Sequence, residues 1–216
     1  MTIMNQLTAQ DINVIPEFQK PKGVALVYPD KLPDKRDELI GFYDSFIQLL
    51  LDSSGLSEIT IIHRPGLKES LSKKFTDKRI NLIEIANVQD IWIRDWGAIA
   101  ATSDKVIKAH YSPAYFPEHE KKYAHLDDQA GYELFTKLNL NADSIICQNE
   151  KLILDGGNFI HNGNGIGITT NRIIADNESL SIGQIREAFQ EQLGIKKLVI
   201  VPVEPGDETG HIDGMV

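Results

Sequence analysis

Cysteine is almost absent from this chain of 216 residues, which contains only Cys147. A single cysteine cannot form an internal disulfide, and this composition fits a reducing compartment. Residues 1–18 show no basic flank followed by an apolar run, so they do not resemble a secretory signal. No apolar stretch approaches the roughly 20 residues needed to cross a bilayer. The sequence therefore predicts a cytoplasmic protein with no membrane partner.

Dense clusters of lysine and arginine are also missing. The formal net charge is −9, and the paired lysines at 73–74, 121–122 and 196–197 stand apart from one another. Binding to a phosphate backbone relies on clustered cations, so nucleic acid is not an expected partner. With 42% hydrophobic and 25% charged residues, the chain can bury a sizeable core and is expected to fold.

Motifs for nucleotides and metals are absent as well. The chain has no GxGxxG after a strand, no GxxxxGK loop and no GxSxG turn. A metal site needs three or four convergent ligands, and the histidines show no HExxH or comparable spacing. We therefore expect neither a metal nor another cofactor.

What is present is an alternation of β-branched apolar runs with helical patterns. Strands are predicted at 23–29, 58–65, 105–112 and 197–203, with helices around 39–50, 67–75, 129–138 and 181–194. Residues 80–101 are too β-branched and aromatic for a helix, and 144–174 are strand material cut by the turns DGGN and HNGNG.

The polar segment 114–129 is predicted to be a surface loop of the kind that covers a site. This order indicates an α/β protein with more strands per helix than a doubly wound sheet, and no linker divides it.

Three short stretches after predicted strands are rich in Asp, Gly, His and Trp, namely 90–98, 154–165 and 207–216. In the first, two tryptophans beside Asp95 could form an aromatic wall next to a carboxylate. A structural alternative is that Arg94 pairs with Asp90 while the tryptophans fill the core. In the third, alternation along an extended segment would place His211 and Asp213 on one face. A purely structural or partial metal-binding role for this H-x-D pattern stays open.

Taken in order, DIWIRDWG, LDGGN with its following NGNG turn, and GHIDGMV resemble the agmatine deiminase and Porphyromonas-type peptidyl-arginine deiminase family of the pentein superfamily. The segment VIPEFQKPKGVALVYP resembles the opening strand of the same family, so the resemblance covers nearly the whole chain. It implies a pentein-type pseudosymmetric α/β propeller of ββαβ-like units. The propeller would be incomplete here, and residues 1–216 would form the N-terminal portion of a deiminase domain.

The resemblance also implies roles for individual residues. Asp95 and Asp213 would hold the guanidinium of a small cationic substrate, and His211 would be the general acid and base. Asp155 would orient that histidine, while Trp92 and Asn158 are further candidates for substrate contacts. The chemistry is reasonable because a guanidinium is planar and donates only, so two carboxylates can bind it through paired hydrogen bonds.

In the family mechanism a cysteine thiolate attacks the guanidinium carbon, ammonia leaves, and water hydrolyses the covalent intermediate. The family has that cysteine in a motif near its C-terminus, and no such motif occurs in these 216 residues. Cys147 lies in the apolar context SIICQ, which favours a buried structural thiol over a nucleophile.

Agmatine, converted to N-carbamoylputrescine, is the first expectation for the substrate. A peptidyl-arginine deiminase, an amidinotransferase and a non-catalytic guanidinium-binding protein are the alternatives. A homo-oligomer is compatible with all of them.

Overall fold

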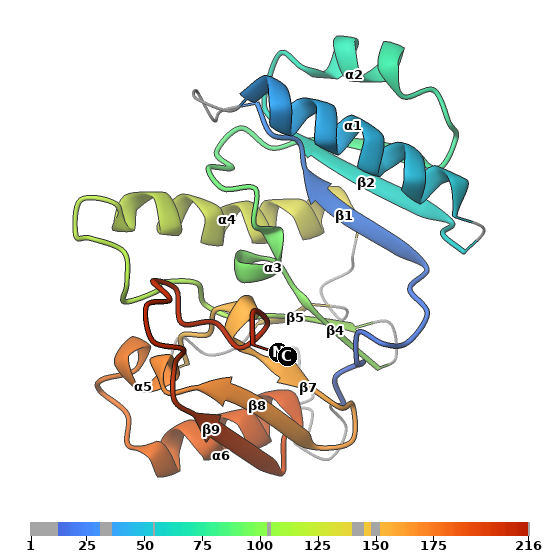
Figure 1. Ribbon diagram of the computed structural model, residues 1–216. Coiled ribbons are helices and arrows are strands. Elements are labelled where there is room, and N and C mark those ends of the chain that lie inside the picture. The colour runs from blue at the N-terminus through green and yellow to red at the C-terminus, as the bar shows by residue number, and fades with distance from the viewer. Residues whose placement is uncertain are drawn as a thin grey trace, which may run out of the picture.

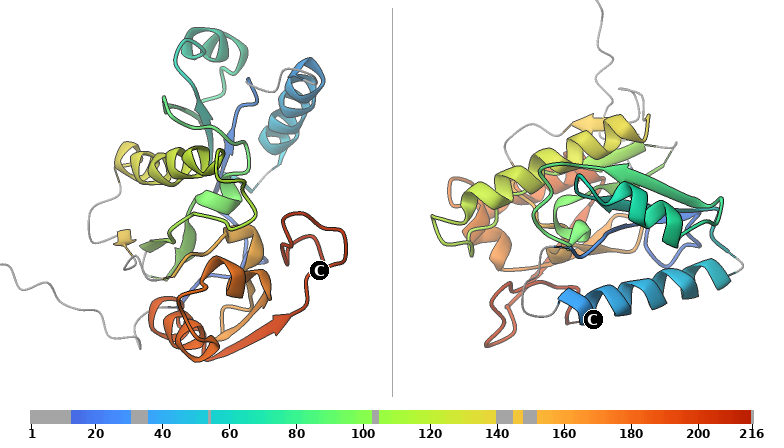
Figure 2. Two further views of the ribbon diagram at one scale, coloured as in Figure 1. Left: turned by 90° about the vertical axis from the view of Figure 1, so that its left-hand side faces the viewer. Right: turned by 90° about the horizontal axis from the view of Figure 1, so that it is seen from above.

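The structure is a computed structural model that describes residues 13–30, 36–53, 55–102, 105–139, 145–147 and 152–215, with only the backbone at 145–147. Its strands form three sheets of three strands each, ordered β1-β2-β3, β4-β5-β6 and β7-β8-β9. The first sheet and its helices form one end of the molecule, and the third sheet forms the other (Figure 1). Figure 2 shows the same order from the side, with α4 between the two ends.

The first sheet is entirely parallel. It contains β1 (Gly23–Val27), β2 (Glu58–His63) and β3 (Ile80–Glu84), connected by α1 (Arg36–Asp52) and α2 (Lys68–Lys74). Alternation along β2 supplies two cores. Ile59 and Ile61 pack with residues of α1 and α2, whereas Ile62 belongs to a second core that contains Trp96. The sheet is therefore covered on both faces, as a parallel sheet requires.

The second and third sheets repeat one topology. In the second, β4 (Ile99–Ala101) is antiparallel to β5 (Lys105–Lys108), α4 (Lys121–Lys137) follows, and β6 (Ile145–Cys147) is parallel to β5. In the third, β7 (Ile160–His161) is antiparallel to β8 (Ile166–Thr170), α5 (Arg172–Asp176) and α6 (Ile182–Leu193) follow, and β9 (Lys197–Val201) is parallel to β8. Each is a ββαβ unit, although the two share no obvious sequence repeat.

Three sequence predictions of secondary structure are wrong in part. Within 80–101 the chain forms a single helical turn, α3 (Ile93–Trp96), which places Trp96 fully in the core. Helix α4 begins at Lys121 rather than near 129. Its first two turns read as a polar loop in the sequence, but Asp127 and Asp128 face inward and accept backbone N–H groups. Residues 172–174 were expected to be strand but belong to α5, whose Ile173 is buried beneath the third sheet unit.

The helix predicted around 181–194 is confirmed, together with its capping box and its left-handed C-cap at Gly194. Ser181 Oγ accepts from Gln184 N, and Gln184 Oε1 accepts from Ser181 N.

Replacing Ser181 with alanine should lower the free energy of unfolding by about 1 kcal/mol, because helix donors lose a partner. Urea denaturation of Ser181→Ala would measure this, with exposed Ser179→Ala as the control. Equal losses in both variants would contradict the capping role.

Among the described residues, none of the helices combines the length and the hydropathy of a membrane span.

Candidate functional site

Three segments that are far apart in sequence meet near the middle of the molecule. They are α3, the short 3-10 helix η2 (Gly156–Asn158) with the preceding Asp155, and the turn after β9 that carries His211 and Asp213. Figure 1 shows the last of these, at the red end of the chain, returning beside α3. Backbone bonding fixes this return, since Asp213 N donates to Gly157 O at 3.2 Å. The meeting point joins all three motif-bearing stretches.

His211 lies between two carboxylates. Its Nε2 is 2.9 Å from Asp155 Oδ2, and its Nδ1 is 3.8 Å from Asp95 Oδ1. The short contact assigns the Nε2 proton to the bond with Asp155, which leaves Nδ1 as the nitrogen free to exchange a proton on the Asp95 side. Asp155 is almost completely buried and also accepts from Gly157 N at 3.2 Å. The arrangement can therefore fix one imidazole tautomer beside a second carboxylate.

Burial and mutual charge shift the titration of this cluster. Burial, and next the negative charge of Asp155, raise the pKa of Asp95 to about 8. Burial by itself would lower the pKa of His211, but the hydrogen bond and charge of Asp155, with smaller contributions from Asp95 and Asp213, raise it instead. These shifts reflect carboxylates crowded into a buried cluster, whose ionised form a bound cation would stabilise.

The two glycines of DGGN allow these groups to approach. A Cβ on Gly156 would lie 2.0 Å from Arg94 O, inside α3. A Cβ on Gly157 would lie 2.4 Å from His211 Nδ1 and 2.5 Å from Asp95 Oδ1. A side chain at Gly156 would overlap the backbone of α3, and one at Gly157 would displace His211 and Asp95, so the glycines are a requirement of the site and not only of a turn.

Asp213 faces an arginine of the protein itself. Arg94 Nε lies 3.0 Å from Asp213 Oδ2, in ion-pair range but without hydrogen-bond alignment. Arg94 also contacts Glu17 and donates to Phe159 O at 3.3 Å. The structural alternative in which Arg94 pairs with Asp90 is therefore wrong.

The tryptophans of the same motif behave differently from each other. Trp96 fills the core, as the structural alternative expected, whereas Trp92 is 63% exposed. Asp90 is occupied within its own turn, where Oδ1 accepts from Trp92 N at 3.0 Å. Trp92 thus remains available to a ligand.

The expected extended segment around His211 and Asp213 is also wrong. Met215 N donates to Ile212 O, so residues 212–215 form a turn. The two side chains reach the same region because the turn is tied to Gly157, not because of strand alternation. Asp213 remains the more exposed, with 34% of its side chain accessible against 8% for His211.

Asn158 is fully buried, and its Oδ1 accepts from Thr170 N at 2.9 Å. Its Nδ2 is buried without a hydrogen-bond partner among the described residues. This orphan donor fits the expectation that Asn158 faces a ligand, although the bond to Thr170 also ties η2 to β8.

Sequence reasoning missed two residues of the site. Tyr115 donates its hydroxyl to Asp155 Oδ2 at 2.9 Å, and Arg172 lies over the Tyr115 ring at 5.7 Å. Arg172 further donates to Thr209 O and Glu208 O, beside His211. The available signal was the prediction that the loop from residue 114 covers a site.

Cys147 belongs by its backbone to β6, opposite Lys108 of β5. Its side chain lies outside the described part of the structure, so its predicted burial stays a prediction.

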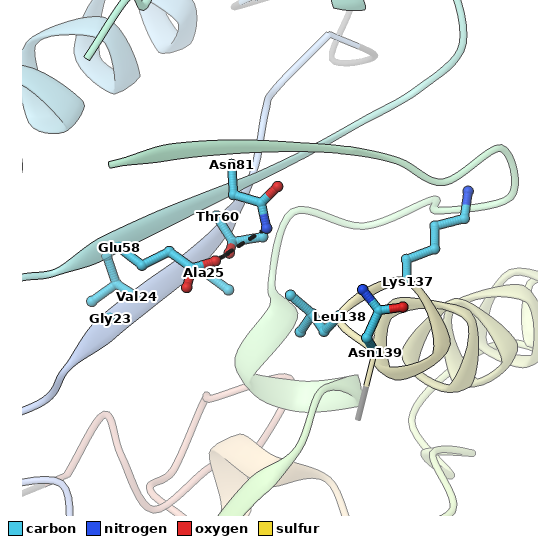
Figure 3. Close-up of a pocket in the computed structure, with 9 residues that line it drawn as sticks. All are labelled: Gly23, Val24, Ala25, Glu58, Thr60, Asn81, Lys137, Leu138 and Asn139. Carbon is cyan, nitrogen blue, oxygen red and sulfur yellow. Dashed lines mark hydrogen bonds between the residues drawn. The ribbon is translucent and has the colours of Figure 1, made fainter. Parts of the chain in front are cut away.

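A hollow of about 500 Å³ lies elsewhere, between the first sheet and the end of α4. Figure 3 shows Glu58, Thr60 and Asn81 on the sheet side and Lys137 to Asn139 on the helix side. None of its lining residues belongs to the His211 cluster. We place the candidate site at His211 because the buried charges and the orphan donor gather there.

The donor atoms of Asp95, Asp155 and His211 lie within 4.8 Å of one another, so the cluster has the dimensions to hold a cation. One oxygen of Asp155 already accepts from both Tyr115 and His211. A planar organic cation that approaches from the Asp95 side would leave those bonds intact, whereas a metal ion would compete with them.

The fold and this cluster define an α/β propeller of the pentein type, incomplete in this chain, with a carboxylate–imidazole centre. The family model of Porphyromonas-type peptidyl-arginine deiminase matches residues 13–216, and the chain belongs to that family. The fold class and family expected from the three motifs are thereby confirmed. The family consists of hydrolases that act on guanidino groups.

Solved structures share this fold. The agmatine deiminase of C. jejuni superposes with a TM-score of 0.73 at 24% identity, covering 94% of this chain and 60% of that one. The agmatine deiminase of Enterococcus faecalis gives a TM-score of 0.76 at 16% identity, covering 94% of this chain and 57% of that one. The present chain therefore spans about three fifths of the length of these structures.

Proposed function

We propose that this chain supplies the guanidinium-binding and proton-transfer groups of a hydrolase that releases ammonia from a small guanidino compound, agmatine first. The observation that carries the proposal is the convergence of Asp95, Asp155 and His211, from three separate segments, within 4.8 Å. Two similar folds are named agmatine deiminases, which supports the choice of substrate. Residues 1–216 would then be part of a deiminase domain whose nucleophile lies outside this sequence.

In this proposal Asp95 and Asp213 hold the guanidinium through charge-assisted hydrogen bonds, and Trp92 and Asn158 contact the substrate. His211, held by Asp155 through Nε2, gives a proton from Nδ1 to the leaving ammonia and later takes one from water. The nucleophile that attacks the central carbon would be a cysteine, as the family resemblance implies. The product would carry a ureido group.

Agmatine binding is expected to depend on both carboxylates, and more strongly on Asp95. Asp95→Asn should weaken binding by roughly 2–5 kcal/mol, because the cation would remain half paired in a partly desolvated site. Asp213→Asn should cost less, since Arg94 already neutralises part of that charge and the side chain is more exposed. Calorimetric titration with agmatine would measure both, with the exposed Glu178→Gln variant as the control. Wild-type affinity in both Asp variants would refute the assignment.

Binding is also expected to release a proton. Because the pKa of Asp95 is raised to about 8, this carboxyl is mostly protonated below that pH in the free chain. A bound guanidinium stabilises the ionised form, so affinity should rise with pH from 6 to about 8, by up to about tenfold per pH unit, and then level off. Protonation of His211 at the acid end would weaken cation binding further.

Calorimetry in two buffers of different ionisation enthalpy would count the protons released at pH 7. The Asp95→Asn variant should release fewer. An affinity that is flat between pH 6 and pH 9, with no proton release, would contradict the role of Asp95.

A further inference from the structure

The hydroxyl of Tyr115 and the imidazole of His211 share one acceptor. Tyr115 Oη and His211 Nε2 each lie 2.9 Å from Asp155 Oδ2. The two rings also meet edge to face, with centroids 5.8 Å apart and planes at 67°. Asp155 is only 1% exposed, so these donors, and Gly157 N on the other oxygen, replace water around the carboxylate.

Tyr115 is held in place by the neighbouring sheet unit. The preceding residue, Ala114, donates its N–H to Asp176 Oδ1 of α5 at 2.8 Å. The guanidinium of Arg172 covers the Tyr115 ring and donates to Thr209 O and Glu208 O, in the turn that carries His211. Tyr115 and His211 are therefore fixed by the same arginine, although they belong to different units of the propeller.

We propose that Tyr115 is a positioning residue for His211, acting through Asp155. A hydrogen bond donated to a carboxylate stabilises its negative charge and reduces its basicity. Without the Tyr115 hydroxyl, Asp155 would hold the imidazolium form of His211 more tightly, and His211 would give up its proton only at a higher pH. With the Tyr115 hydroxyl in place, Asp155 still accepts the hydrogen bond from His211 Nε2 and orients the ring. It does not hold the imidazolium form so tightly that Nδ1 cannot release its proton.

Other groups also act on His211 and stay unchanged when Tyr115 is replaced. They are Asp95 from α3, Asp176 from α5, and Asp207 and Asp213 from its own turn. Two positive groups face this surrounding: Arg172 lies over the Tyr115 ring, and Arg94 lies beside Asp213. A change in the titration of His211 on removal of one phenolic oxygen would therefore report the Tyr115–Asp155 bond.

The test is a histidine NMR titration of the ligand-free 216-residue chain. His211→Gln assigns the His211 resonance among the six histidines. Tyr115→Phe should move its titration upward, on the order of 0.5–1 pH unit, while the exposed Tyr123→Phe leaves it in place. No shift, or a downward shift, in folded Tyr115→Phe would overturn the proposal.

A second measurement keeps a phenolic hydroxyl at position 115. Replacing Tyr115 with a fluorinated tyrosine preserves the shape of the side chain and makes its hydroxyl a stronger donor, so the His211 titration should move downward. An upward or absent shift would contradict the proposal even if Tyr115→Phe fails to fold.

The importance of the His211 proton rests on the proposed function, but the titration needs no substrate. Failure of agmatine to bind would remove the proposed function and leave this result standing. Normal agmatine binding together with an unmoved His211 titration would refute the role of Tyr115 and leave the proposed function standing.

Discussion

Purified as the 216-residue chain, this protein should release no ammonia from agmatine above the uncatalysed background. The guanidinium carbon is resonance-stabilised, so polarisation by Asp95 and Asp213 alone would not bring water to react with it at a useful rate. A nucleophile is needed, and the sequence offers only Cys147 as a thiol. Loss of the nucleophile in a serine protease costs on the order of a millionfold in turnover. A comparable loss here would place activity below ordinary detection.

The assay is ammonia release, with the ureido product measured in parallel. A chain extended to include a cysteine motif of the family is the positive control. Cys147→Ser should leave agmatine binding unchanged, and a thiol reagent should label Cys147 slowly in the folded chain. Robust turnover by the 216-residue chain, or fast labelling that agmatine blocks, would make Cys147 the candidate nucleophile.

The same experiments separate the alternative functions. Ammonia release by the extended chain without an added amine favours a deiminase, whereas a requirement for an amine acceptor favours an amidinotransferase. Agmatine binding without turnover in the extended chain would favour a non-catalytic guanidinium-binding protein. Replacing agmatine with a peptide that contains arginine tests the peptidyl substrate.

Gly157→Ala is expected to abolish measurable agmatine binding while the chain still folds. The new Cβ would lie 2.4 Å from His211 Nδ1 and 2.5 Å from Asp95 Oδ1, closer than Cβ atoms essentially ever come to other atoms. Both side chains are largely buried, so the strain must be relieved by displacing them. A shift of about 1 Å in a positioned group can cost about a hundredfold, and here two groups would move.

Gly214→Ala is the matched control, because a Cβ there would meet nothing within 4 Å although the position adjoins Asp213. Neither glycine has a positive φ, so backbone strain does not distinguish them. Calorimetry measures binding, and circular dichroism with thermal unfolding verifies the fold. Unchanged affinity in folded Gly157→Ala would mean that the His211–Asp95 pair is not where agmatine binds.

Local patterns in the sequence were sufficient for features that depend on neighbours along the chain. The apolar run at 197–203 predicted β9, and Ser181 with Gln184 predicted the start of α6, because hydrogen bonds within one strand or one turn follow from nearby residues. The joint order of DIWIRDWG, LDGGN and GHIDGMV was sufficient for the family, and it marked Asp95, Asp155, His211 and Asp213 as candidates.

Only the tertiary structure decided which groups face one another. Arg94 lies beside Asp213 and not Asp90, and Tyr115 shares Asp155 with His211, because these partners are separated by 40 positions or more. The start of α4 was predicted too late for a similar reason, since Asp127 looks like a solvated residue in sequence but is buried and accepts from the backbone N–H of Gln89. Polar residues take their roles from what the fold places opposite them, whereas apolar periodicity reports only which side faces inward.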